Sequence, residues 1–321
     1  MTTLVFGLAR ALSRTLGPDD EVVVSRLEHD ANFTPWVQAA RDAGATVREA
    51  PIRTGDCTLD LDALRALMTP ATRLVAITAA SNAVGSLTPV REVADMAHAA
   101  GAELFVDAVH YAPHRSIDVE AWGCDYLACS PYKFFGPHMG ILWGRREAME
   151  RAPAYKLRPP ADELPHRWMT GTPCHEGIAG TTAAIDYLAG LADDTAARRA
   201  ALLVAFERIR AHETALVTRL LSGLAAMSRI TVHGITDPAR VDERVPTVAF
   251  THDTRSPTEI ARHLGELGIF VWDGNYYALP LTEALGVEPA GMVRVGFLHY
   301  NTEEEVDRLL DALDGMERAG T

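Results

Sequence analysis

The sequence has little positive charge and few cysteines, and each scarcity excludes a class of protein. Its 30 Lys and Arg stand against 43 Asp and Glu, which leaves a formal net charge of −13 over 321 residues. Nucleic-acid surfaces need clustered Lys and Arg, so this balance argues against a nucleic-acid partner and, more weakly, against an anionic membrane surface. Four cysteines without a C-x-x-C pair do not make a disulfide framework. They favour a reducing, cytoplasmic compartment.

Long apolar runs and leader signals are also absent. No stretch reaches the ~18 apolar residues of a membrane-spanning helix. The first 17 residues begin apolar, but Arg10 and Arg14 interrupt them and no basic region precedes them, unlike a secretory signal. No G-x-G-x-x-G or G-x-x-x-x-G-K-[ST] nucleotide motif occurs. With 48% hydrophobic and 23% charged residues, the composition is that of an ordinary globular protein, and we expect no metal site.

What is present is an alternation of short β-branched runs and longer amphipathic segments. Runs typical of buried strands lie at 21–25, 45–50, 73–78, 102–108, 125–130 and 140–144, and helical patterns lie at 3–16, 34–43, 60–68 and 89–100. Strands that alternate with helices form a mostly parallel sheet covered on both faces, so we predict a large α/β domain over 1–200. After a long helical pattern at 196–224, the pattern of predicted strands and helices changes. This predicts a smaller α+β domain over 201–321.

Polar side chains follow several of the predicted strands, at the edge where a parallel sheet binds its ligands. The carboxylate of Asp107 ends an apolar strand, where it is costly unless it is paired with a cation or donor. Lys133 lies between aromatic residues, where a lysine loses its proton more easily and becomes a nucleophile. On these residues alone the pair is either a buried salt bridge that stabilises the fold or part of a catalytic site.

A pyridoxal phosphate site needs a set of this kind. A lysine holds the cofactor as a Schiff base, a carboxylate keeps the ring nitrogen protonated, and a flat side chain stacks on the ring. Hydroxyls and helix N–H groups hold the phosphate. Thr2 and Thr3 open the first predicted helix, where hydroxyl residues suit either simple capping or an anion site.

Ordered motifs along almost the whole chain carry a resemblance to a known family. They read EHDAN at 28–32, SNAVGSLTPV at 81–90, VDAVHYAPH at 106–114, DYLACSPYKFFGP at 125–137, GTP at 171–173 and MVRVGFLHYNTEEEVDRL at 292–309. With these motifs the chain resembles the class V aminotransferase and cysteine desulfurase family. The resemblance implies the fold type I of pyridoxal 5′-phosphate-dependent transferases, a small amino-acid substrate, and a homodimer with a shared active site.

The resemblance also implies a role for individual residues. Lys133 matches the Schiff-base lysine, Asp107 the partner of the ring nitrogen, and His29 the residue that stacks on the ring. Asn82 and His110 match positions near the ring hydroxyl, and Arg294 matches the planar fork that clamps the substrate α-carboxylate. The matched phosphate contacts are Thr2, Thr3, Ser130, Tyr132 and, from the other subunit, Thr172.

Four of these residues also have structural interpretations. His29 could cap a turn or lie in the core, and Asn82 could brace the turn before Gly85. His110 could be structural, and Arg294 could form a surface ion pair. These alternatives remain open at the level of the sequence.

The chain departs from the desulfurase pattern at two places. No cysteine follows Cys174, and Tyr277 or a near neighbour stands where desulfurases carry their nucleophilic cysteine. A thiolate accepts sulfur and a phenol does not, so we expect no persulfide-forming desulfurase. The aromatic residues Trp272, Tyr276 and Tyr277 either select a different substrate side chain or pack the domains together.

The second departure is at the start. The resemblance implies a further segment before Thr2, so a late start codon, a fragment and a genuine short form all remain open. The predicted activity is a lyase that acts at Cα and Cβ by C–S or other β-elimination. An aminotransferase or an epimerase is the alternative within the family. A truncated, non-catalytic relative is the alternative from another class.

Overall fold

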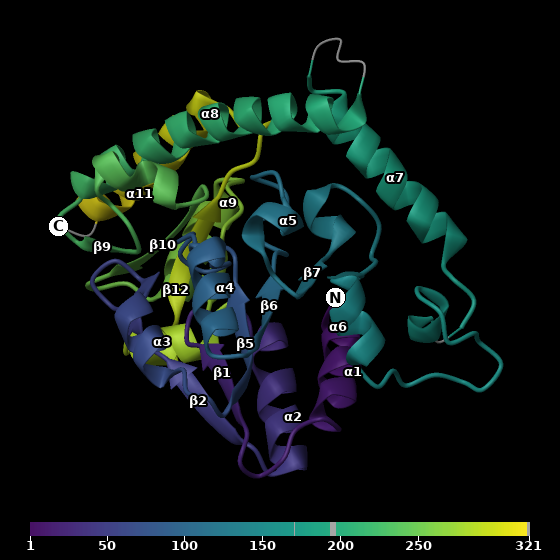
Figure 1. The fold of residues 1–321 in the computed structure, drawn as a ribbon. Helices are drawn as coiled ribbons and strands as arrows, with labels where there is room; N and C mark the ends of the chain where they lie inside the picture. The colour runs from purple at the N-terminus through teal and green to yellow at the C-terminus, as the bar shows by residue number, and fades with distance from the viewer. Residues whose placement is uncertain (170, 193–196, 320–321) are drawn as a thin grey trace.

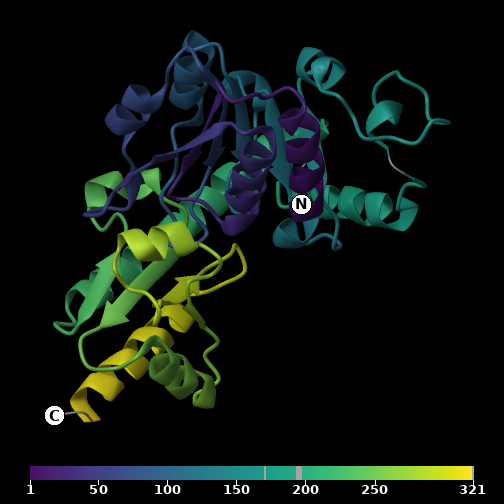
Figure 2. The same cartoon turned by 90° about the horizontal axis from the view of Figure 1, so that it is seen from below.

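The computed structural model describes residues 1–169, 171–192 and 197–319. Two sheets with their helices form a large and a small lobe, and the long helix α8 (Arg198–Ala225) runs across both of them (Figure 1). Seen from below, the small lobe, coloured green to yellow, lies beside the purple-to-teal large lobe (Figure 2). The chain therefore forms two layered lobes, each built on its own sheet.

The described part of the large lobe contains a sheet with the strand order β2-β1-β5-β6-β7-β8. Its strands are parallel except for β8, which runs antiparallel to β7. Every residue of β1 is buried, as expected for a strand covered on both faces. The strands are β1 (Glu21–Ser25), β2 (Thr46–Ala50), β5 (Thr72–Thr78), β6 (Glu103–Asp107), β7 (Tyr126–Cys129) and β8 (Ile141–Gly144), with a separate hairpin of β3 (Ile52–Arg53) and β4 (Thr58–Leu59).

Helices cover both faces of this sheet because successive side chains along a strand point to opposite sides. Val22 and Val24 pack with α1, α2 and α6 on one face. Val23 and Val75 pack with α3, α4 and α7 on the other. The helices are α1 (Thr2–Ser13), α2 (Thr34–Ala43), α3 (Leu61–Leu67), α4 (Val90–Ala99), α5 (Val119–Trp122), α6 (Arg146–Arg151) and α7 (His175–Ala189), with the 3-10 turns η1 (Asp30–Asn32), η2 (Pro131–Phe134) and η3 (His166–Trp168).

The small lobe is an antiparallel sheet with the order β11-β12-β10-β9. One face packs against helices, and the other packs against a short helix and residues of the large lobe. Leu220, Phe250 and Leu313 lie at the centre of its core. Its elements are β9 (Ile230–His233), η4 (Pro238–Glu243), β10 (Thr247–His252), α9 (Pro257–Glu266), β11 (Trp272–Gly274), α10 (Leu279–Ala284), β12 (Met292–Gly296) and α11 (Glu303–Ala319).

Helix α8 contributes to both cores. Its first half packs Phe206 and Ile209 against the large lobe, and its second half packs Leu216 and Leu220 into the small one. The division at residue 200 stays a prediction, since the helix that follows it belongs to both lobes.

A buried arginine fastens the two lobes together. Arg244, 2% exposed, donates to the carbonyls of Val84 at 3.2 Å, Thr247 at 2.5 Å and Ile235. Burial lowers the pKa of its guanidinium to about 10, so it stays charged at neutral pH. Gly85 lies in the same contact with φ +81°, and a Cβ there would come within 2.5 Å of the Thr247 carbonyl oxygen. Only glycine allows the Ser81–Thr88 segment to approach β10 this closely.

Candidate functional site

The carboxyl ends of β1, β5, β6 and β7 meet at one edge of the large sheet because these strands are parallel. Asp107, the last residue of β6, is 3% exposed, and its Oδ1 accepts a hydrogen bond from the Val109 backbone N–H at 2.8 Å. Burial raises the pKa of this carboxyl to about 7, against the opposing influence of the backbone hydrogen bond, of the N-terminal ammonium of Met1 and of the charge on Lys133. A nearby cation would therefore be strongly favoured beside Asp107.

Lys133 follows β7 on η2, and its Nζ lies 5.1 Å from the centre of the Tyr132 ring. Desolvation by the surrounding protein lowers the pKa of its ammonium, Arg294 lowers it further, and Asp107 raises it. Lys133 and Asp107 thus influence each other's charge, yet they form no salt bridge in the described structure. The structural salt bridge considered from sequence is absent between them. The chain contains one other lysine, Lys156.

His29 lies in the turn after β1. Its Nδ1 accepts a hydrogen bond from the Ala31 N–H at 3.0 Å, so the side chain caps η1 as one sequence alternative proposed. Burial lowers the pKa of this histidine, and the charges of Lys133 and Arg294 lower it further. Its ring is stacked on the ring of Tyr277, with centroids 5.5 Å apart and planes 25° from parallel. The histidine is therefore a neutral, oriented, flat group at the site.

Asn82 and Arg294 are joined across the two lobes. The Arg294 Nη1 donates to the Asn82 backbone carbonyl at 2.8 Å, and the Asn82 Nδ2 donates to the Tyr276 carbonyl at 2.9 Å. The other side-chain atom of Asn82, Oδ1, is buried without a hydrogen-bond partner. No carboxylate among the described residues forms an ion pair with Arg294, so the structure does not support the surface ion pair considered from sequence. An unsatisfied buried acceptor and a half-buried guanidinium without an ion pair both mark a ligand site.

His110 begins a buried polar chain. Its Nε2 lies 2.8 Å from the Thr247 Oγ1, and its ring contacts the ring of His114 edge to face. The Nδ1 of His114 in turn lies 3.0 Å from Glu213 on α8. Burial holds the pKa of His110 well below its ordinary value, with the charges of His114 and Arg294 adding to the effect. His110 is thus neutral and held by Thr247. The His114–Glu213 pair was not predicted, because its partners are 99 positions apart.

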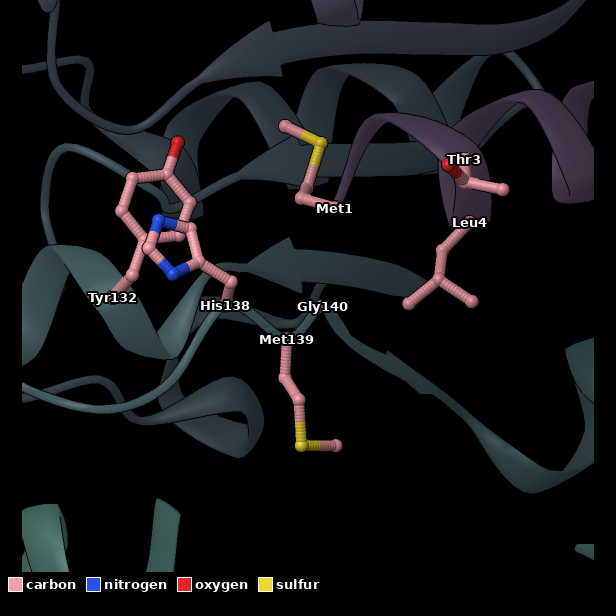
Figure 3. Close-up of a pocket in the computed structure, with 7 residues that line it drawn as sticks. All are labelled: Met1, Thr3, Leu4, Tyr132, His138, Met139 and Gly140. Carbon is pink, nitrogen blue, oxygen red and sulfur yellow. The ribbon is translucent and has the colours of Figure 1, made fainter. Parts of the chain in front are cut away.

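The residues expected at the phosphate lie at the start of α1 and on η2. A pocket of about 350 Å³ is lined by Thr3, Tyr132, His138 and neighbours (Figure 3). The Tyr132 and His138 rings stack 5.1 Å apart. Ser130, which precedes Tyr132 by two residues, is buried, and Thr2 is exposed. A helix N-terminus and two hydroxyl side chains beside one pocket suit an anion.

Thr172 is exposed and lies in the segment between α6 and α7. Figures 1 and 2 both show the described part of this segment extending away from the body of the large lobe. Among the described residues, Thr172 forms no side-chain hydrogen bond with another candidate residue. Its role toward a second subunit stays a prediction.

Glu28 lies at the site, although the sequence patterns assign it no role. It is fully buried and accepts hydrogen bonds from the Asn32 Nδ2 at 2.6 Å and the Thr78 N–H at 2.8 Å. Burial raises its pKa to about 8, and the charge of Asp107 adds to the effect. Glu28 is therefore protonated at neutral pH and ties the His29 turn to β5.

Two further features bear on the class of protein. Within the described residues, no three His, Cys, Asp or Glu side chains are grouped so that they could hold a metal ion. No helix in the described part of the chain has the length and apolar character to cross a bilayer.

Comparison with known proteins now identifies the family. The model of the class V aminotransferases matches residues 2–309. The chain is 32% identical to a cysteine desulfurase of Dickeya dadantii over 97% of its length and 74% of that protein. It is 35% identical to the aminotransferase-like protein FGM3 of Gibberella zeae, over 98% of this chain and 76% of that one. It is 36% identical to the nonribosomal peptide synthetase-like enzyme fsqF of Aspergillus fumigatus, over 98% of this chain but only 21% of that one.

Solved structures give the same result for the fold. The Escherichia coli cysteine desulfurase CsdA superposes with a TM-score of 0.84 at 27% identity, over 99% of this chain and 77% of that one. A cysteine desulfurase of Thermococcus onnurineus superposes with a TM-score of 0.86 at 26% identity, over 99% and 78%. The family and the fold type I architecture predicted from the sequence are confirmed. The chain belongs to the class V aminotransferase family of pyridoxal phosphate-dependent enzymes and is cysteine desulfurase-like within it.

Proposed function

We propose that this chain uses pyridoxal 5′-phosphate to act at Cα and Cβ of a small amino acid, as a lyase that eliminates a sulfur or other leaving group from Cβ. The observation that carries the proposal is the convergence of Lys133, Asp107 and Arg294 from three separate elements. Arg294 and Asp107 both act on the charge of Lys133, although they come from different lobes. A nucleophilic amine, a carboxylate and an unpaired guanidinium in one place are what amino-acid chemistry on this cofactor requires.

The residues present suit the cofactor. The buried Oδ1 of Asn82 has no donor, and the Asp107 carboxyl has a pKa raised by burial without a salt-bridge partner. A ligand that brings a hydroxyl and a protonated ring nitrogen would satisfy both. We assign Lys133 to the covalent attachment, Asp107 and His29 to the ring, and Asn82 with His110 to the side of the ring hydroxyl. Thr2, Thr3, Ser130 and Tyr132 are assigned to the phosphate. The bound cofactor supplies an electron sink that weakens the bonds at Cα.

The side chains then divide the work. Arg294 binds the α-carboxylate and so fixes which face of Cα points toward Lys133. Lys133, whose pKa is lowered by its surroundings, takes the proton from Cα and passes a proton to the group that leaves Cβ. Asp107 stabilises positive charge on its side of the site, and the neutral His29 ring provides a flat contact. Tyr277, stacked on His29, screens part of the site from water.

Elimination is preferred over persulfide chemistry because the chain carries no cysteine after Cys174. A leaving sulfur would therefore go to solvent and not to an enzyme thiol. Transamination is the second candidate, and the similarity to the aminotransferase-like protein FGM3 favours it. The products separate the two, since elimination from L-cysteine releases sulfide, ammonia and pyruvate without an acceptor. Transamination instead requires a 2-oxo acid and releases no ammonia.

We further propose a homodimer that shares the site, in the cytoplasm. The extended segment between α6 and α7, which carries Thr172, supports the dimer. The four cysteines are free thiols, three of them buried, which supports a reducing compartment. Sedimentation velocity of the wild type and of Thr172→Ala, with cofactor retention measured in parallel, tests the shared site.

The first experiment compares the two lysines. Lys133→Arg and Lys156→Arg both keep the positive charge and remove the primary amine. After incubation with pyridoxal phosphate and desalting, the wild type and Lys156→Arg are expected to retain a visible absorption band, and Lys133→Arg is expected to lose it. Borohydride reduction followed by peptide mass spectrometry should place the modification on Lys133. A wild type that retains no band would favour the non-catalytic alternative, and equal bands in both variants would reject Lys133.

A further inference from the structure

Tyr276 stands beside the two residues that join the lobes at the site, and none of the roles assigned above includes it. We propose that Tyr276 is the positioning residue for Arg294. Its ring contacts the guanidinium and orients the edge of that group that has no protein partner toward a single substrate carboxylate. The inference rests on the proposed function, because it concerns how this site recognises an amino acid. It makes Tyr276 a determinant of selectivity for α-amino acids over amines.

The contacts form a closed triangle across the lobes. The Arg294 Cζ lies 4.5 Å from the centre of the Tyr276 ring. The Arg294 Nη1 donates to the Asn82 carbonyl at 2.8 Å, and the Asn82 side chain donates to the Tyr276 carbonyl at 2.9 Å. Each residue therefore holds the other two, and the orientation of the guanidinium depends on where the Tyr276 ring lies.

The Tyr276 ring is itself held firmly. The side chain is 6% exposed, and its hydroxyl donates to the carbonyls of Met292 and, at 3.3 Å, Trp272. Its backbone adopts φ 55°, a left-handed conformation that aromatic residues rarely take. The next residue, Tyr277, has φ 60°, and its carbonyl accepts a hydrogen bond from the Asp30 N–H at 2.6 Å. The surrounding contacts thus maintain a conformation that the backbone alone would not favour.

The electrostatics explain why an aromatic ring suits this place. Burial lowers the pKa of Arg294, so the site must compensate the guanidinium for lost water. An Asp or Glu would do so by neutralising the charge and would then compete with a substrate carboxylate. The face of the Tyr276 ring stabilises the cation and leaves its net charge in place. No carboxylate of the described residues pairs with Arg294, in accord with this division.

The geometry also limits what is bound. With Nη1 engaged by Asn82 and one face against Tyr276, one edge of the fork remains for a bidentate contact. One edge accommodates one carboxylate. This arginine therefore binds a single carboxylate of the amino acid.

The test uses the cofactor-loaded protein and two probes that differ only in the carboxylate, L-alanine and ethylamine. Binding is followed as a change in the visible spectrum. Tyr276→Leu removes the aromatic ring, Tyr276→Phe keeps the ring and removes the hydroxyl, and Tyr277→Leu serves as the matched neighbour. We expect Tyr276→Leu to weaken L-alanine binding by about 3- to 30-fold and ethylamine binding by less than about twofold. Tyr276→Phe should restore the wild-type ratio of the two affinities. Tyr277→Leu should leave that ratio unchanged, whatever it does to either affinity.

A loss of affinity for both probes to the same extent would show that Tyr276 only supports the fold, and unchanged affinity for L-alanine would likewise overturn the proposal. A second readout needs no cofactor. Phenylglyoxal modification, quantified by peptide mass spectrometry, should be several-fold faster at Arg294 in Tyr276→Leu than in the wild type, relative to the exposed Arg41. An unchanged rate at Arg294 would overturn the positioning role. If the wild type retains no cofactor, the proposed function fails, and the arginine reaction alone decides the role of Tyr276.

Discussion

The carboxyl edge of the large sheet and the segment Trp272–Leu279 of the small lobe face the same site, but they hold their side chains in different ways. Asp107 ends a buried parallel strand and accepts a hydrogen bond from its own following turn. Tyr276 and Tyr277 lie in a connection between β11 and α10, in left-handed backbone conformations. Regular strand geometry fixes the first group, and long-range contacts fix the second.

The difference separates two tasks. In the proposed function, the residues at the strand ends bear on the bond-breaking chemistry, because Lys133 and Asp107 would handle the proton and the charge. The tyrosine segment contacts Arg294 and His29 and so bears on which molecule is admitted. Changes at the sheet edge should abolish the reaction, whereas changes in the segment should redirect it.

The largest effect is expected from Asp107→Asn, which keeps the size and the acceptor for Val109 but loses the negative charge. In the cofactor-loaded protein this variant would lose the charge pair with the protonated ring nitrogen. Loss of a buried charge pair costs roughly 3–5 kcal/mol, so activity should fall by about 10²- to 10⁴-fold. The matched control is Asp125→Asn at the opposite edge of the sheet. Asp125 is also buried and accepts from the Leu104 N–H at 2.8 Å. Steady-state rates and melting temperatures should show lost activity in the first variant and lost stability alone in the second. Equal activity losses would contradict the assignment of Asp107.

An intermediate effect is expected from Glu28→Gln, on the pH dependence of the free energy of unfolding. The folded protein holds the Glu28 proton up to a pKa of about 8, whereas the unfolded chain releases it near 4.5. Between these values the folded state binds more protons, so the free energy of unfolding falls as pH rises, by up to about 1.4 kcal/mol per pH unit. Asp107 adds a titration of the same sign in the cofactor-free protein. Chemical denaturation should give Glu28→Gln a flatter profile than the wild type, and parallel profiles would show that Glu28 is ionised in the fold.

The smallest effect is expected from Tyr277→Leu. Loss of the stacked contact with His29 removes roughly 0.5–1.5 kcal/mol, or about 2- to 12-fold in rate constants. Because Tyr277 is 71% exposed, the change should alter the relative kcat/KM among amino acids with different side chains. Cofactor retention after desalting should match the wild type. A loss of the cofactor band would show that Tyr277 contributes to cofactor binding, as the sheet-edge residues do, and would contradict the proposed difference between the two regions.

The position of the sheet-edge residues could be predicted because strand runs in an α/β pattern dictate a common edge. The roles that the family motifs imply for them stay predictions. The triangle of Asn82, Tyr276 and Arg294 could not, since its contacts span 194 and 212 positions. Helix α7 was also missed, because glycines and threonines at 177, 180, 181 and 182 weaken its helical pattern.

The buried Arg244 also bears on how the chain folds. Its charge is compensated by carbonyl dipoles that come from both lobes, Val84 on one side and Thr247 and Ile235 on the other. Neither lobe alone offers this full set of acceptors, so unfolding of one lobe would break hydrogen bonds to Arg244 and expose the surface that the other lobe covers. The lobes should therefore unfold together, in one cooperative transition, despite their separate cores. The fastening at Gly85 and Arg244 makes the molecule a single thermodynamic unit.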